Sequence, residues 1–219
     1  MIDIIREIEA AQRELGNGTI AAGDGPMIRI QRTYDAPIED VWDALTNPDR
    51  IGRWFLPISG DYRIGGRYQF DGNAGGEILV CDRPHRLRTS WGFGATAAAD
   101  GSELEVRLSP AGEERTLFEF EHTAVVPEEM WAEFGPGAVG VGWDGGLLGL
   151  ALHLRGGSVS DPIAWQLSPE GREFFTRSSN AWGAAFAASG ADPEAVAKAV
   201  ANTTAFYAPD PEAPDAAPG

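Results

Sequence analysis

Alternating apolar and polar residues fill the middle of the chain, from about residue 58 to residue 122. The apolar positions form four runs: Tyr68 and Phe70; Leu87, Thr89, Trp91 and Phe93; Leu104, Val106 and Leu108; Phe118, Phe120 and His122. Arginines and glutamates occupy most positions between them. Because successive side chains of a strand point to opposite faces of a sheet, this pattern predicts an antiparallel sheet with one covered, apolar face and one charged, wet face.

One more strand and two helix starts precede this region. Residues 28–34 alternate in the same way, although Arg32 does not fit the pattern. Asp35-Ala36-Pro37 and Asn47-Pro48-Asp49 each combine a capping side chain with a proline, which is a helix-start signal. The first helix should bury Ile38, Val41, Trp42 and Leu45, and the second should end near Phe55.

The N-terminal segment has apolar residues at helical spacing. Ile4, Ile8, Ala11 and Leu15 share one stripe, Asp3 can cap the helix and Gly16 can end it. The pattern predicts an amphipathic helix over residues 3–15. A polar, glycine-rich linker should then lead from residue 17 to residue 26.

A long helix over residues 139–154 is expected to cover the apolar face of the sheet. It has an apolar stripe (Trp143, Leu147, Leu150 and Leu154), an almost opposite apolar stripe (Val141, Leu148 and Leu152), and a stripe of Gly142, Gly146, Gly149 and His153. A helix that is apolar on several sides is buried on several sides. Ser168-Pro169 and Asp192-Pro193 predict two C-terminal helices that would cover its back.

Composition and charge narrow the classes of protein and partner. Hydrophobic residues make up 43% and charged residues 23% of the 219 positions, as in water-soluble globular proteins. A net charge of −16 offers no attraction to nucleic-acid phosphates or anionic lipids, so we expect no nucleic-acid partner. No apolar run is long enough for a membrane span, so we expect no membrane insertion. The charged N-terminus is unlike a signal peptide, which predicts a cytoplasmic location.

Histidine and cysteine positions suggest no reactive centre. His85, His122 and His153 lack the local spacing of metal ligands. Cys81 is the single cysteine, and we expect it to be structural. The sequence therefore predicts no catalytic residue, no metal and no cofactor. For His122, on an apolar strand face, two interpretations stay open: a buried histidine bonded to backbone, or a polar group at a pocket wall.

Aromatic residues gather on the expected apolar face of the sheet. Six of them alternate with polar neighbours: Tyr68, Phe70, Trp91, Phe93, Phe118 and Phe120. They can simply pack as a core. Because glycines on the long helix remove bulk opposite them, they can also line an apolar cavity, the usual form of a small-molecule site.

The order of these elements resembles the START-like (SRPBCC) superfamily. The blocks that carry the closer resemblance, to the bacterial branch of heat-shock protein 90 ATPase activator homologues, are Tyr34 to Asp49, Arg53-Trp54-Phe55, Gly65 to Tyr68, Gly75 to Glu77 and Thr116 to Thr123. The resemblance covers roughly residues 28–154. It implies an α+β helix-grip fold, in which a curved antiparallel sheet surrounds a long C-terminal helix, here with extra N-terminal and C-terminal helices.

This fold implies a division of the chain into four parts. Residues 1–25 would form the N-terminal helix and linker, and residues 26–156 the START-like domain. Residues 157–207 would form a C-terminal helical annex packed on the same domain. Residues 208–219 would be a disordered, acidic, proline-rich tail.

The resemblance implies a carrier or sensor of an apolar small molecule, lipid or polyketide-like, because members of the superfamily bind such ligands. The expected ligand-binding residues are Trp54, Tyr68, Phe70, Trp91, Phe118, Phe120, His122, Trp143 and Leu147. Two alternatives stay open: a cyclase or aromatase-type enzyme, and a chaperone-related or protein-interaction module. The sequence offers no convergent acid and base pair for an enzyme. The C-terminal helices are the expected surface for a homodimer or a protein partner.

Overall fold

Eight strands form one antiparallel sheet, in the order β1-β2-β8-β7-β6-β5-β4-β3, in the computed structural model, which describes residues 2–93 and 101–210. The strands are β1 (Ala11–Ile20), β2 (Gly23–Tyr34), β3 (Ile58–Gly60), β4 (Arg67–Phe70), β5 (Gly75–Asp82), β6 (Arg86–Ser90), β7 (Ser102–Gly112) and β8 (Arg115–Ala124). The predicted tail lies outside the described residues from residue 211 onward.

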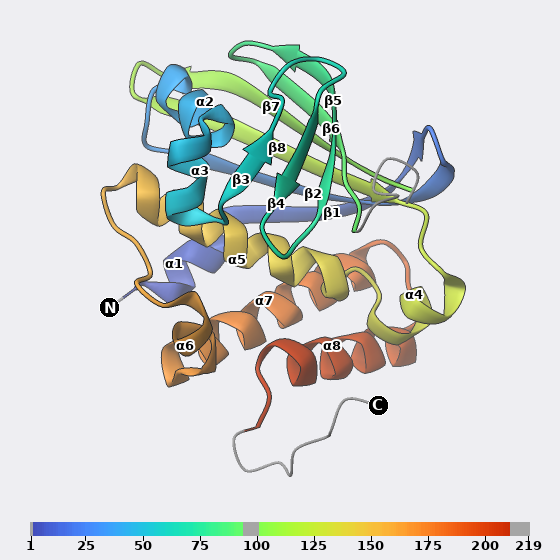
Figure 1. The fold of residues 1–219 in the computed structure, drawn as a ribbon. Helices are drawn as coiled ribbons and strands as arrows, with labels where there is room; N and C mark the ends of the chain where they lie inside the picture. Colours follow the sequence, from blue (N-terminus) through green and yellow to red (C-terminus); the bar gives the residue numbers. More distant parts are fainter. Residues whose placement is uncertain (1, 94–100, 211–219) are drawn as a thin grey trace.

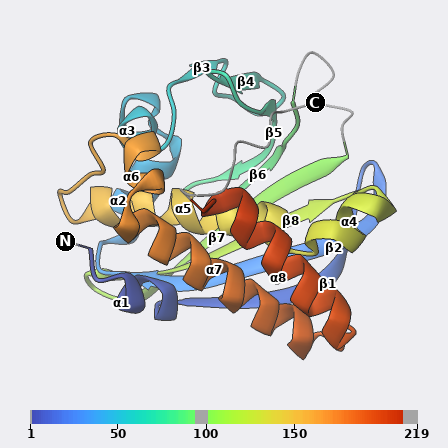
Figure 2. The same cartoon turned by 90° about the horizontal axis from the view of Figure 1, so that it is seen from below.

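The helices lie mainly on one side of this sheet. They are α1 (Ile4–Glu9), α2 (Ile38–Thr46), α3 (Pro48–Trp54), α4 (Glu128–Phe134), α5 (Gly137–Leu154), α6 (Pro162–Leu167), α7 (Pro169–Ala188) and α8 (Pro193–Tyr207). The sheet curls around α5, and α7 and α8 form a further layer behind α5 (Figures 1 and 2). The predicted α+β helix-grip fold is thus confirmed.

The inner face of the sheet forms the main core with α5. Ile30, Phe118 and Phe120 are almost completely buried there, as the alternating pattern predicts. Glycines of α5 let other elements approach closely. A Cβ on Gly140 would overlap the indole of Trp182 in α7. The indole of Trp182 thus fills the space that a side chain at position 140 would occupy.

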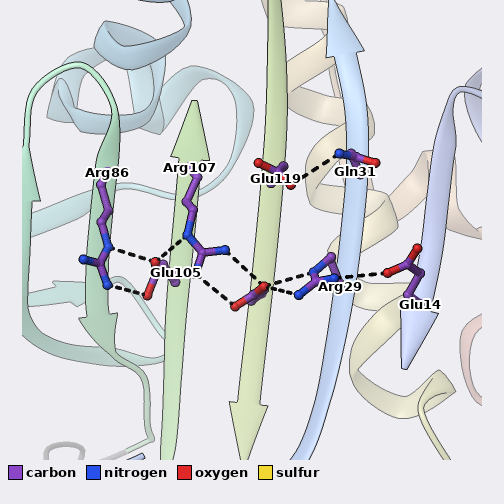
Figure 3. Close-up of polar contacts among 8 residues, drawn as sticks. Glu14, Arg29, Gln31, Arg86, Glu105, Arg107 and Glu119 are labelled. Atoms are coloured by element: carbon purple, nitrogen blue, oxygen red, sulfur yellow. Dashed lines mark hydrogen bonds and ion pairs between the residues drawn. The ribbon is translucent and has the colours of Figure 1, made fainter. Parts of the chain in front are cut away.

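The outer face of the sheet has a row of ion pairs that crosses neighbouring strands (Figure 3). Arg86 of β6 pairs with Glu105 of β7 at 2.8 Å. Glu121 of β8 accepts from Arg29 of β2 at 2.7 Å and from Arg107 of β7 at 3.1 Å. Positive and negative side chains alternate across the strands, so this face largely neutralises its own charge.

The prediction for the N-terminal segment is wrong beyond residue 9. Only residues 4–9 are helical, and residues 11–20 form β1, which pairs with β2 where a linker was expected. Within β1, Gly18 packs closely against β8, because a Cβ at this position would overlap the side chain of Thr123. The apolar spacing at residues 8, 11 and 15 suits a helix, but strand pairing satisfies the backbone instead.

Arg32, the residue that broke the alternation of β2, points to the inner face. Its side chain is 7% exposed, and its Nη2 donates to Glu7 of α1 at 3.0 Å. Arg155, directly after α5, also binds Glu7. Arg32 can therefore lie on an apolar face, because the carboxylate of Glu7 in α1 compensates its charge.

Two helices were not predicted. α6 begins with Asp161-Pro162, the same start signal as α8, so the sequence contained the information to predict it. α4 follows Pro127 without a side-chain cap, and none of its residues is buried. The sequence signal for α4 is therefore weak. Within the described parts of the chain, no helix is both long enough and apolar enough to cross a membrane.

Candidate ligand-binding site

Two adjoining cavities lie between the inner face of the sheet and the helices. The inner chamber has a volume of about 170 Å³, and the outer chamber about 530 Å³. The inner chamber is lined by residues of α2, α3, α5 and the strands β3 to β8. The outer chamber is lined by residues of α4, the start of α5 and the ends of β2, β7 and β8. Its volume falls within the range of small-molecule sites.

The inner chamber contains almost all of the predicted ligand-binding residues. It is lined by Trp54, Tyr68, Phe70, Trp91, Phe118, Phe120, Trp143 and Leu147, together with further aliphatic side chains and Phe55. Of the predicted set, only His122 is not part of this wall. The structure thus brings the predicted residues together around one space.

A phenol and a hydroxyl are the polar groups at one side of the inner chamber. The hydroxyl of Tyr68 donates to the carbonyl of Ser90 at 2.8 Å and lies 3.2 Å from Oγ1 of Thr89. Burial raises the pKa of Tyr68 to about 12. Tyr68 therefore stays a neutral phenol at physiological pH.

The outer chamber opens through an apolar rim. Four of its lining residues are exposed hydrophobic side chains: Phe93, Val125, Met130 and Val139. The prediction that Phe93 belongs to the covered face is wrong, because β6 ends at Ser90 and Phe93 is 65% exposed. Exposed apolar groups beside a cavity are typical of a binding site.

Three aromatic residues line both chambers and separate them: Phe55, Trp91 and Trp143. The rings of Trp91 and Trp143 have centroids 5.0 Å apart. The rings of Phe55 and Trp143 are nearly parallel, with centroids 6.3 Å apart. Trp143 thus lies at the centre of the partition.

His122 holds this partition through a chain of hydrogen bonds. Nε1 of Trp143 donates to Nδ1 of His122 at 3.0 Å, and Nε2 of His122 lies 2.7 Å from Oγ of Ser102. Oγ of Ser102 donates to the carbonyl of Trp91 at 2.9 Å. Since Nδ1 must accept, the proton belongs on Nε2, and His122 is neutral.

The environment of His122 favours the same neutral form. The residue is 6% exposed, and burial lowers its pKa to about 4. Of the two interpretations that the sequence left open, the pocket wall is the better description, because His122 lines the outer chamber. Its partners are side chains rather than the backbone.

His153 lies outside both chambers. Arg50 donates to its Nε2 at 3.2 Å, and burial together with Arg50 and Arg53 lowers its pKa. Cys81 is exposed and lies in the wall of the inner chamber. Among the described residues, no group of three or more potential ligands could hold a metal ion.

Sequence reasoning missed much of the outer chamber. Its wall includes α4, which was not predicted, and Ser102, whose link to His122 joins two strands 20 residues apart. Phe55 was available in the sequence as the end of the second helix. Its place between the chambers depends on the path of the chain after α3.

A curled antiparallel sheet around one long helix, with an aromatic cavity between them, defines a START-like helix-grip protein. Residues 35–154 match the family model described as Activator of Hsp90 ATPase homolog 1-like protein. The chain belongs to this family, as its sequence blocks predicted.

Solved structures agree with this assignment. The crystal structure of CalU16 from Micromonospora echinospora is 38% identical, with a TM-score of 0.64 over 80% of this chain and 98% of that chain. The solution NMR structure of CalU16 is 39% identical, with a TM-score of 0.67 over 83% and 97%. EF2215 from Enterococcus faecalis, 16% identical with a TM-score of 0.53 over 82% and 92%, shares the fold alone. No curated protein sequence is significantly similar to this chain.

Proposed function

We propose that this protein binds an apolar small molecule, lipid or polyketide-like, in the two chambers between the sheet and α5, as a carrier or sensor. The observation that carries the proposal is the composition of the wall. Aromatic and aliphatic side chains dominate it, and no charged residue is found among the described residues that line either chamber. Large rings supply contact area at low entropic cost, and a few polar groups orient the ligand.

An enzyme of the cyclase or aromatase type has less support. General acid-base catalysis needs a group whose pKa lies near the working pH. Tyr68, with a pKa of about 12, and His122, with a pKa of about 4, are both far from neutrality. Both nitrogens of His122 also have partners already. Shape and apolar contact are therefore what the chambers offer.

The test is binding of an apolar fluorescent probe, N-phenyl-1-naphthylamine, to the purified protein. The wild type should bind it saturably at one site. Gly146→Leu adds bulk to the inner chamber, because a Cβ at Gly146 points toward Phe55 at ordinary contact distance. We expect this variant to weaken binding at least tenfold.

Gly157→Leu is the matched control, since Gly157 follows α5 outside both chambers. It should bind the probe like the wild type. Absence of saturable binding to the wild type, or equal binding by both variants, would contradict the proposal. Native mass spectrometry of the gently purified protein would then identify the natural ligand as added mass. Turnover of such a ligand would instead favour the enzyme.

A further inference from the structure

In the partition between the chambers, Trp143 is the residue whose ring is held by a hydrogen bond to His122. Trp91 is fixed through its backbone, which donates to Ser102 at 2.9 Å and accepts from the Ser102 hydroxyl. Trp143 is fixed in the partition by the hydrogen bond of its indole to His122. Rotation of the Trp143 side chain would therefore open the partition without moving a strand.

Space for this rotation exists in the outer chamber of about 530 Å³, which Trp143 lines. Gly142, which precedes Trp143, lines the outer chamber, and Gly146, about one turn later, lines the inner chamber. The space directly beside these two glycines is occupied, because a Cβ at Gly142 would lie 2.9 Å from the hydroxyl of Tyr207 and one at Gly146 would lie 3.6 Å from Phe55. The neighbouring rings of Phe120 and Trp91, with centroids 4.6 Å and 5.0 Å from that of Trp143, remain as walls.

The hydrogen bonds of His122 determine which chemical group can replace the Trp143 indole N–H on Nδ1. Because Nε2 of His122 is directed to Ser102, and the Ser102 hydroxyl donates onward to Trp91, Nδ1 stays an acceptor. Leaving a buried acceptor without a donor costs about as much free energy as losing a hydrogen bond. The replacement must therefore bring an O–H or N–H donor.

We infer that Trp143 is a gate between the chambers, and that the ligand is an uncharged, elongated apolar molecule whose hydroxyl group replaces the indole N–H on Nδ1 of His122. The inference rests on the proposed function and specifies its ligand. One apolar end occupies the aromatic inner chamber, and the other lies in the outer chamber toward the apolar rim. The exchange of one donor for another keeps Nδ1 of His122 hydrogen-bonded.

The experiment compares 4-hydroxystilbene with 4-methoxystilbene, an elongated pair that differs in the donor. On the wild type, the hydroxyl compound should bind roughly tenfold or more tightly, because the ether leaves Nδ1 without a donor. The NMR signal of the Trp143 indole N–H, identified by its loss in Trp143→Phe, should shift when 4-hydroxystilbene binds. Trp143→Phe removes the bond that must be broken and should strengthen 4-hydroxystilbene binding roughly fivefold.

Trp165→Phe is the matched control. Trp165 lines neither chamber, and its Nε1 donates to Oε2 of Glu170 at 2.8 Å. This variant should keep the wild-type preference for the hydroxyl compound. If Trp143→Phe does not fold, the wild-type affinities and the indole signals, assigned by other means, still decide.

Equal affinity for the two stilbenes, or an indole signal of Trp143 that does not shift, would overturn the gate. Binding of N-phenyl-1-naphthylamine with no binding of either stilbene would overturn the gate and leave the proposed function standing. Failure of all three compounds to bind would overturn both.

Discussion

Arg13 of β1 donates from Nε to Oδ2 of Asp144 in α5 over 2.9 Å, although 131 positions separate the two residues. Both side chains are almost completely buried, at 7% and 3% exposure. The same carboxylate oxygen accepts from Ser178 and, at 3.1 Å, from Trp182 of α7. A single acidic group thus connects the sheet edge, the central helix and the helix layer behind it.

Removal of this carboxylate should strongly destabilise the fold. Asp144→Ala leaves the guanidinium of Arg13 buried without its partner, which costs about 3–5 kcal/mol in comparable cases. Urea unfolding measures the loss. Glu173→Gln, which breaks the exposed pair with Arg177 within α7, should change the free energy of unfolding by about 0.5 kcal/mol or less. Similar losses in the two variants would contradict the role of Asp144.

Acidification should reduce stability through His122. Its pKa is about 4 in the folded protein, below the ordinary value of 6.5. The unfolded chain therefore takes up a proton at higher pH than the folded chain does. The stability that the neutral imidazole contributes is present above pH 6.5 and lost as pH falls to about 4, a change of about 3 kcal/mol.

His122→Gln keeps an acceptor and a donor but does not titrate. The difference in free energy of unfolding between wild type and variant should therefore change across this pH window. Carboxylates titrate in both proteins, so their effect cancels in the comparison. Parallel curves for the two proteins between pH 6.5 and pH 4 would refute the prediction.

Close packing at Gly140 should make this position intolerant of the smallest side chain. Gly140→Ala places a Cβ against the buried indole of Trp182, so we expect a loss of about 1–3 kcal/mol in thermal or urea unfolding. Gly146→Ala is the control on the same helix, because its Cβ meets Phe55 at 3.6 Å. That variant should be neutral or more stable by up to about 1 kcal/mol. Equal behaviour of the two alanines would show that Trp182 moves aside.

The ion pairs of the outer sheet face should contribute modestly and depend on salt. Burial alone would raise the pKa of Glu121, but hydrogen bonds from Arg29 and Arg107 lower it on balance. Because both arginines are partly exposed, Glu121→Gln should cost about 0.5–1 kcal/mol at low salt. The cost should shrink at about 1 M salt, where charges are screened within a few ångströms. A cost independent of salt would point to packing instead.

The sequence predicted the sheet well because alternation reports burial on one face directly. Ile28, Ile30 and Phe120 are inner-face residues in the structure as in the prediction. β1 was not predicted because its inner face includes the charged Arg13. The partner of Arg13, Asp144, becomes a neighbour only in the folded chain. Local periodicity contains no information about such distant compensation.

The candidate site was predictable in part, as the sheet was. The aromatic wall of the inner chamber follows from strand alternation and helix spacing. The network of His122 does not, because Ser102 and Trp143 reach it from β7 and α5 through strand register and helix rotation. The outer chamber also depends on α4, which contributes no buried residue and hence no apolar pattern.

The pairing of β2 with β8 determines when the cavity can form during synthesis on the ribosome. Tyr34 of β2 pairs with Thr116 of β8. More than eighty further residues must therefore be synthesised after the β1-β2 hairpin before β8, its neighbouring strand, is available. α5, which lines both chambers, emerges later, and Tyr207 of α8, in the wall of the outer chamber, later again. A ligand therefore meets a complete site only after α8 has been synthesised. Its stabilising effect should appear in slower unfolding of the mature protein, while the refolding rate stays the same.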